Sequence, residues 1–202
     1  MEGLDAAPDN ALQGSADHRG GRESRLPPGG IRELGLINWV LAKLGARSLN
    51  VPKMHLFHAL GQHKLLFWLW LPIANALLRG RLPGVDTELV ILRVAHLRDC
   101  EYERQHHRRI ARRRGLDAQQ QELIFQWPNI PSDVCGLTAR QQALLCATDE
   151  FVMNRSVSDG SWQRLSGYLD RRQLIEFCLL IGQYDGLAAT ISTLGVALDR
   201  PQ

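Results

Sequence analysis

Six side chains that could carry acid–base or nucleophilic chemistry lie in the short stretch from Glu88 to His107: Glu88, Cys100, Tyr102, Glu103, His106 and His107. Cys100, Glu103 and His107 are spaced by three and then four residues, so on a helix they would share one face. A cysteine at a helix N-terminus feels the positive end of the helix dipole, which favours the reactive thiolate. A histidine titrates near neutral pH and can take the thiol proton. If Glu88 folds back against this helix, it joins Cys100, Tyr102, Glu103 and His107 in a predicted proton relay.

The same residues have two other interpretations. Glu103 and His107, with arginines around them, could form an ion-pair ladder on an exposed helix face. Cys100, Glu103, His106 and His107 could instead ligate zinc, but the sequence has no CxxC and no HExxH pattern. We therefore expect neither a metal nor a cofactor.

The elements that position these residues are predicted to be helices. Apolar residues recur with helical spacing along most of the chain, and no segment alternates between apolar and polar residues beside a hairpin turn. The expected fold is all-α, a compact bundle of about seven to nine helices. Residues 1–24 are polar and rich in small residues, which predicts a disordered tail. Residues 25–200 are expected to form one helical domain.

Several residues mark where the helices should begin and end. Gly115 is placed to end the helix that starts near Cys100. Pro72 should break or kink the apolar helix that starts near Gln62. Helix starts are predicted from capping patterns at Asn50 with Pro52 in the first turn, Asp117 with Gln120, Thr138 with Gln141, Ser158, and Asp170 with Gln173.

Composition and charge fit a soluble protein of the reducing cytoplasm. Hydrophobic residues make up 45% of the chain, charged residues 22%, and the net charge is +3. The basic run from Arg104 to Arg114 has no aromatic interleaving and indicates a solvated helix face, so no nucleic acid is expected. The apolar segment 65–78 is too short to span a bilayer and indicates a buried or subunit-contact helix, so no membrane is expected either. No secretory signal is visible, and four cysteines without paired spacing do not predict a disulfide framework.

The stretch TELVILRVAHLRDCEYERQHHRRIARRRGLD resembles the carboxymuconolactone decarboxylase / alkylhydroperoxidase D-like family. The pattern of the peroxidase branch is a glutamate, a CxxC pair and a histidine, and Glu88, Cys100 and His107 match it. Glu103 stands where the second cysteine would be. Further resemblance lies in LCATDEF, VSDGSW and LIEFCLLIGQYDGLAATISTLGV. The resemblance implies an all-helical fold, homo-oligomers such as trimers or hexamers, and either peroxide reduction or decarboxylation of a lactone acid.

Three functions follow from the residues and the resemblance together. In the first, the protein is a thiol-dependent peroxidase: Cys100 attacks a hydroperoxide, His107 is the base, and Glu88 and Glu103 relay protons. Without a neighbouring second cysteine, Cys100 would need an external thiol reductant. Alternatively Cys135 could resolve it, provided that the two Cα atoms come within about 7 Å.

The second function is a decarboxylase, lyase or isomerase for a small carboxylated lactone or a related aromatic-degradation intermediate. Here His107 and Glu88 move the proton, and Arg93 or Arg104 holds the substrate carboxylate. The third function is a non-enzymatic oligomeric binding protein. Its apolar pocket would be lined by Trp68, Trp70 or Phe57.

Overall fold

The computed structural model describes residues 24–130 and 136–199. Within these ranges the chain forms nine helices and no strand, which confirms the predicted all-α fold. The predicted disordered tail, residues 1–24, lies outside the described residues except for Ser24. The single domain over residues 25–200 stays a prediction. The helices are α1 (Ile31–Ser48), α2 (His55–Leu60), α3 (Lys64–Leu78), α4 (Gly84–Leu97), α5 (Glu101–Arg113), α6 (Ala118–Gln126), α7 (Ala139–Asn154), α8 (Asp159–Ser166) and α9 (Arg171–Leu194).

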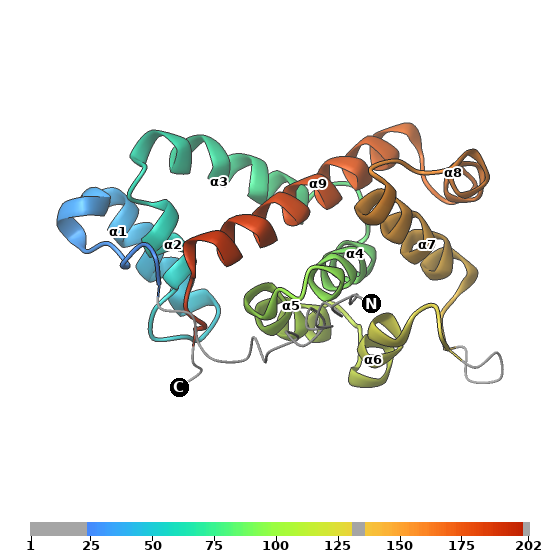
Figure 1. Ribbon diagram of the computed structural model, residues 1–202, viewed down its shortest axis with the longest axis horizontal. Helices are drawn as coiled ribbons and strands as arrows, with labels where there is room; N and C mark the ends of the chain where they lie inside the picture. The colour runs from blue at the N-terminus through green and yellow to red at the C-terminus, as the bar shows by residue number, and fades with distance from the viewer. Residues whose placement is uncertain (1–23, 131–135, 200–202) are drawn as a thin grey trace, which may run out of the picture.

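Helix α4 forms the centre of the bundle. Every residue from Asp86 to Ala95 is buried, because the sequence of α4 is apolar on nearly all sides. The helix packs against α5, α6, α7 and α9, and Figure 1 shows it in the middle of the molecule, below the crossing α9. The few polar side chains of α4, Glu88 among them, are therefore held away from water.

A short turn joins α4 to α5 and reverses the chain. Asp99 adopts a left-handed conformation with φ 47°, which a short polar side chain tolerates. The Cys100 backbone N–H donates to the carbonyl of Ala95 at 2.8 Å and closes the turn. The fold-back on which the relay depends is present, and it places one face of α5 against α4.

Most of the predicted helix ends are confirmed. Asp117, Thr138, Ser158 and Asp170 each accept a hydrogen bond from a backbone N–H in the first turn of the next helix. Gly115 follows α5 with φ 103°, a conformation that glycine adopts without strain. At these positions the capping residue alone is enough to predict where the helix begins.

Three positions in the N-terminal part differ from the prediction. Asn50 does not cap a helix, because it adopts φ 53° in the turn after α1, and α2 begins only at His55. Pro72 lies inside α3 without ending it. Its position is exposed, so water can bind the carbonyl that loses its helical partner. Gly35, with φ 75° and ψ 162°, interrupts α1 instead.

Helix α3 is strongly apolar, but only Phe67 and Leu77 in it are buried. The expectation of a buried helix is therefore wrong, and that of a subunit-contact helix stays a prediction. Exposed apolar side chains cover its outer face: Leu65, Leu66, Trp68, Leu69 and Ile73. In the described residues, α9 is the one helix whose length and composition would allow it to cross a membrane. Eight of its side chains between Leu174 and Ile191 are buried, and core helices commonly meet the same criterion.

Candidate active site

Glu88 and His107 form a buried pair between α4 and α5. Nδ1 of His107 lies 2.8 Å from Oε2 of Glu88, and neither side chain is more than a tenth exposed. The carboxylate fixes the ring so that Nδ1 carries the proton, which leaves Nε2 as the acceptor. Among the described residues Nε2 has no hydrogen-bond partner, so it is free to exchange a proton with a bound molecule.

Two residues that the sequence did not single out complete this pair. Nη1 of Arg114 lies 3.2 Å from Oε1 of Glu88, and its guanidinium also donates to the carbonyl of Leu78 at 2.9 Å. Tyr184 of α9 packs edge-on against the His107 ring, with 5.1 Å between the ring centroids. Burial, and then the charges of the nearby glutamates, raise the pKa of Tyr184 well above its ordinary value. Its hydroxyl therefore stays protonated and can donate a hydrogen bond.

Glu103 is the most unusual side chain of the site. It is 3% exposed, and neither carboxyl oxygen has a hydrogen-bond partner in the described part of the chain. Burial raises the pKa of this carboxyl from 4.5 to about 8. The nearby Cys100 thiol, which forms no hydrogen bond with it, lowers the pKa by a smaller amount. A buried carboxyl in an apolar setting behaves in this way because water no longer stabilises the anion. The surface ion-pair ladder is wrong, since Glu103 and His107 are both buried.

Cys100 lies at the N-cap of α5, as expected, but its thiol is not activated. It is 6% exposed and packs against Leu56, Ala188 and Ile191. Burial, with the nearby Glu103 carboxylate, raises the pKa of the thiol to about 12. The expected thiolate is therefore disfavoured, because loss of hydration and a neighbouring negative charge outweigh the helix dipole.

Tyr102 belongs to a different network from the other predicted site residues. Its hydroxyl donates to Oδ2 of Asp199 at 2.6 Å and accepts from the backbone N–H of Leu56 at 3.2 Å. Both contacts are buried, and burial raises the pKa of the phenol far above its ordinary value. Tyr102 thus anchors the segment after α9 to α2 and α5.

A cavity of about 400 Å³ is lined by several of these groups, but not by Glu88 or Cys100. Its polar side comes from α5 and α9 and its apolar side mainly from α2 and α3, and this size is typical of a site for a small ligand. Phe57 and Trp70 line it as predicted, whereas Trp68 is 48% exposed and does not. The polar lining consists of Ser48, Asn75, Arg79, Tyr102, Glu103, His106, His107, Arg114, Gln183 and Tyr184.

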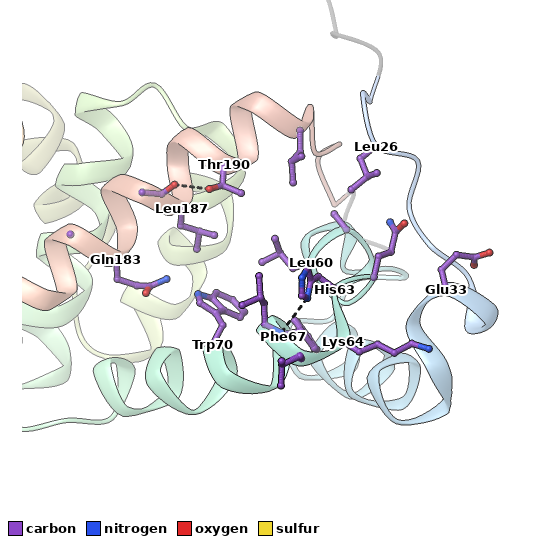
Figure 2. A pocket seen from close by; sticks show the side chains of 17 residues that line it. Leu26, Glu33, Leu60, His63, Lys64, Phe67, Trp70, Gln183, Leu187 and Thr190 are labelled. Atoms are coloured by element: carbon purple, nitrogen blue, oxygen red, sulfur yellow. Dashed lines mark hydrogen bonds between the residues drawn. The ribbon is translucent and has the colours of Figure 1, made fainter.

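A larger hollow of about 1080 Å³ opens between α9 and the start of α3 (Figure 2). Trp70, Gln183 and Leu187 line both spaces. The polar groups of the larger hollow have local roles: His63 accepts from the backbone N–H of Leu66, and Glu33 accepts from that of Gly30. It lacks the buried acid–base groups of the smaller cavity, so the smaller cavity is the candidate active site.

Two sequence-based interpretations of this region are corrected. The described residues contain no group of three or more metal-ligating side chains, because His106 and His107 turn to different carboxylates. Arg93 is held by Asp149 through two hydrogen bonds of 2.6 and 2.8 Å, and Arg104 pairs with Glu101. Neither arginine lines the cavity; Arg114 does. Cys135, the proposed resolving cysteine, lies outside the described residues.

Solved structures with a similar fold come from several bacteria. An alkylhydroperoxidase AhpD core from Ralstonia eutropha, an uncharacterized peroxidase-related protein, has a TM-score of 0.73 and 15% identity over 89% of this chain and 92% of its own. A peroxidase-related protein from a Silicibacter species has a TM-score of 0.70 and 16% identity over 93% and 95%. A protein of unknown function from Agrobacterium tumefaciens has a TM-score of 0.61 and 18% identity over 67% and 91%.

A comparison with proteins of curated function finds no match. The model of the carboxymuconolactone decarboxylase family matches residues 64–149, the segment that holds Glu88, Cys100, Glu103 and His107. The resemblance to the carboxymuconolactone decarboxylase family is thus confirmed over residues 64–149, and the fold of the described chain is like that of the AhpD structures.

Proposed function

We propose that this protein is an acid–base enzyme of the carboxy-lyase or isomerase class, which moves protons on a small organic molecule in the 400 Å³ cavity. The observation that supports it best is Glu103, a buried and unpartnered carboxyl on the cavity wall with a pKa of about 8. Near neutral pH such a group exists in both protonation states, so it can give or take a proton. An unpartnered buried carboxyl destabilises a fold, and a catalytic role explains its presence.

His107 supplies a second proton-transfer group beside Glu103. Glu88 holds its Nδ1, and its Nε2 lacks a partner among the described residues. In a decarboxylation, the carbanion or enolate left by the departing CO2 needs a proton, and protonated Glu103 can provide it. The Tyr184 hydroxyl can donate a hydrogen bond to the oxygen on which negative charge develops.

The cavity suits a small ring compound with one carboxyl or carbonyl group. Its α2 and α3 wall is formed mainly by aromatic and aliphatic side chains such as Phe57, Trp70 and Leu71. Arg114 contributes a positive charge near the polar wall, which favours an anionic group on the substrate. A carboxylated lactone or a related intermediate of aromatic degradation fits this description.

A thiol-dependent peroxidase is the second candidate, and the names of the structures from Ralstonia eutropha and Silicibacter favour it. Its first step needs the Cys100 thiolate. With a pKa of about 12, about one thiol in 10⁵ is ionised at pH 7. Transfer of its proton to Glu103, whose pKa is about 8, costs about 5 kcal/mol. We therefore rank this function below the acid–base reaction.

Paired variants separate the two functions. Purified protein is assayed for turnover of carboxymuconolactone and related carboxylated lactones, and in parallel for consumption of cumene hydroperoxide with dithiothreitol. Glu103→Gln should lower lactone turnover by roughly 10²–10⁴-fold, whereas Cys100→Ser should retain it. Glu101→Gln, an exposed position on the same helix, is the matched control.

Peroxide turnover that Cys100→Ser abolishes and Glu103→Gln leaves intact would contradict the acid–base function and support the peroxidase. Wild-type protein that turns over neither kind of substrate would contradict both, and would leave the non-enzymatic binding protein.

A further inference from the structure

The segment after α9 forms a second carboxylate–imidazole pair beside the first. Asp199 has a fully buried side chain, although it follows the last helix of the chain. Its Oδ2 lies 3.0 Å from Nε2 of His106 and 2.6 Å from the Tyr102 hydroxyl. Its Oδ1 lies 2.6 Å from Nδ1 of His55, whose backbone N–H also donates to it at 2.9 Å.

These contacts keep Asp199 charged. Burial alone would raise the pKa of its carboxyl, but the hydrogen bonds from His106, Tyr102 and His55 outweigh burial and hold the pKa below its ordinary value. A charged carboxylate on one imidazole nitrogen holds the proton on that nitrogen. In His106 this is Nε2, so Nδ1 becomes the nitrogen that can exchange a proton.

Nδ1 of His106 has no partner in the described part of the chain, although the side chain is only 4% exposed. His106 also lines the 400 Å³ cavity, as His107 does. The two adjacent histidines are thus bound to two carboxylates through opposite ring nitrogens, Nε2 in His106 and Nδ1 in His107. Each ring keeps one nitrogen without a partner in the described part of the chain, and both residues line the same cavity.

We propose that His106 is a second histidine acid–base residue of this cavity, that Asp199 positions it, and that the substrate exchanges protons at two different atoms. This inference rests on the proposed acid–base function and narrows the reaction to one that includes a double-bond shift. One imidazole removes a proton from a carbon beside a carbonyl, and the C–H electron pair enters an enolate. The other imidazole, which must start the cycle as an imidazolium protonated from water on its otherwise unpartnered nitrogen, delivers that proton to a carbon further along the conjugated system; the double bond moves, and the carbonyl re-forms. One imidazole has then gained a proton and the other has lost one, and exchange with water restores both.

The ring protonation can be tested without turnover. Protein labelled with ¹⁵N in histidine is studied by long-range ¹H–¹⁵N NMR, with assignment by His106→Gln and His107→Gln. The neutral rings should be of opposite tautomers, with the proton on Nε2 in His106 and on Nδ1 in His107. Benzoate, a small ring carboxylate, is then added as a probe and should shift the Nδ1 signal of His106 and the Nε2 signal of His107. A proton on Nδ1 of His106, or a benzoate response confined to His107, would overturn the inference.

The role in turnover is tested with His106→Gln. The glutamine amide can still donate to Asp199 but has no basic nitrogen, so the anchor of the C-terminal segment remains. We expect kcat for carboxymuconolactone to fall by roughly 10²–10⁴-fold with little change in KM. Asp199→Asn should reduce kcat less and change the His106 signals but not those of His107. His96→Gln, at a histidine outside the cavity, is the control.

The outcomes separate this inference from the proposed function. If Glu103→Gln abolishes turnover while a folded His106→Gln protein remains fully active, the acid–base role of His106 is refuted and the proposed acid–base function stands. If the wild-type protein neither turns over the lactone nor responds to benzoate, both are refuted. A His106→Gln protein with an unchanged melting temperature shows that lost activity does not reflect lost folding.

Discussion

Replacing Glu103 with glutamine should stabilise the fold, and increasingly so as pH rises. Burial raises the pKa of Glu103 from 4.5 to about 8. Between these values the carboxyl is protonated in the folded chain and ionised in the unfolded one. The unfolded state therefore binds fewer protons, and this carboxyl lowers wild-type stability as pH rises from 4.5 to 8. Glutamine has nearly the same shape and no charge, so the Glu103→Gln variant does not lose this stability as pH rises.

The magnitude follows from the two pKa values. Relative to the wild type, the variant gains about 1 kcal/mol at pH 5, about 3 kcal/mol at pH 7 and about 5 kcal/mol at pH 9. The difference in unfolding free energy between variant and wild type therefore grows by about 4 kcal/mol from pH 5 to pH 9. Any effect of the glutamine side chain that is independent of pH cancels in this growth. At pH 7 the gain corresponds to a rise in melting temperature of roughly 6–12 °C.

Urea unfolding monitored by circular dichroism at several pH values between 5 and 9 measures this difference. Glu101→Gln serves as the control, because the Glu101 side chain is half exposed on the same helix and should show no comparable dependence on pH. Parallel stability curves for the Glu103→Gln and wild-type proteins over this range would refute the raised pKa and the acid–base role built on it.

Three further predictions concern the thiol, the arginine and the outer face of α3. Native Cys100 should react with iodoacetamide far more slowly than in the urea-unfolded chain at pH 8, because its pKa is about 12; equal rates, followed by mass spectrometry, would contradict its burial. Arg114→Met should lower stability by about 3 kcal/mol or more in urea unfolding, because it leaves Glu88 buried without its cation; an unchanged midpoint would contradict this. Leu69→Lys should shift the protein towards monomers in light scattering if exposed α3 residues form the predicted homo-oligomer interface; an unchanged oligomeric mass would contradict that interface.

The core of the site could be predicted because it depends on local spacing. The short connection between the two helices permits a fold-back that would bring Glu88 to His107, and Oε2 of Glu88 and Nδ1 of His107 lie 2.8 Å apart. The helix starts at Thr138 and Asp170 were equally predictable, since a cap depends on residues three positions apart.

What the sequence could not predict depends on tertiary burial and distant contacts. A helix N-terminus favours a thiolate, but only the packing of α2 and α9 against Cys100 shows that desolvation dominates. Asp199 lies 93 residues from His106 along the chain, and no local pattern links them. Tyr184 lies in a helix far along the chain from His107, and the contact between their rings depends on how α9 packs beside α5.

The proposed acid–base function depends most on the protonation of Glu103. A ¹³C NMR titration of protein labelled at the glutamate carboxyl carbons, with the signal assigned by Glu103→Gln, measures it directly. We predict a carboxyl resonance that titrates with an apparent pKa of about 8 and disappears in the variant. A Glu103 resonance that titrates near 4.5 would mean that this carboxyl is an ordinary anion at neutral pH, and would contradict the proposed acid–base function.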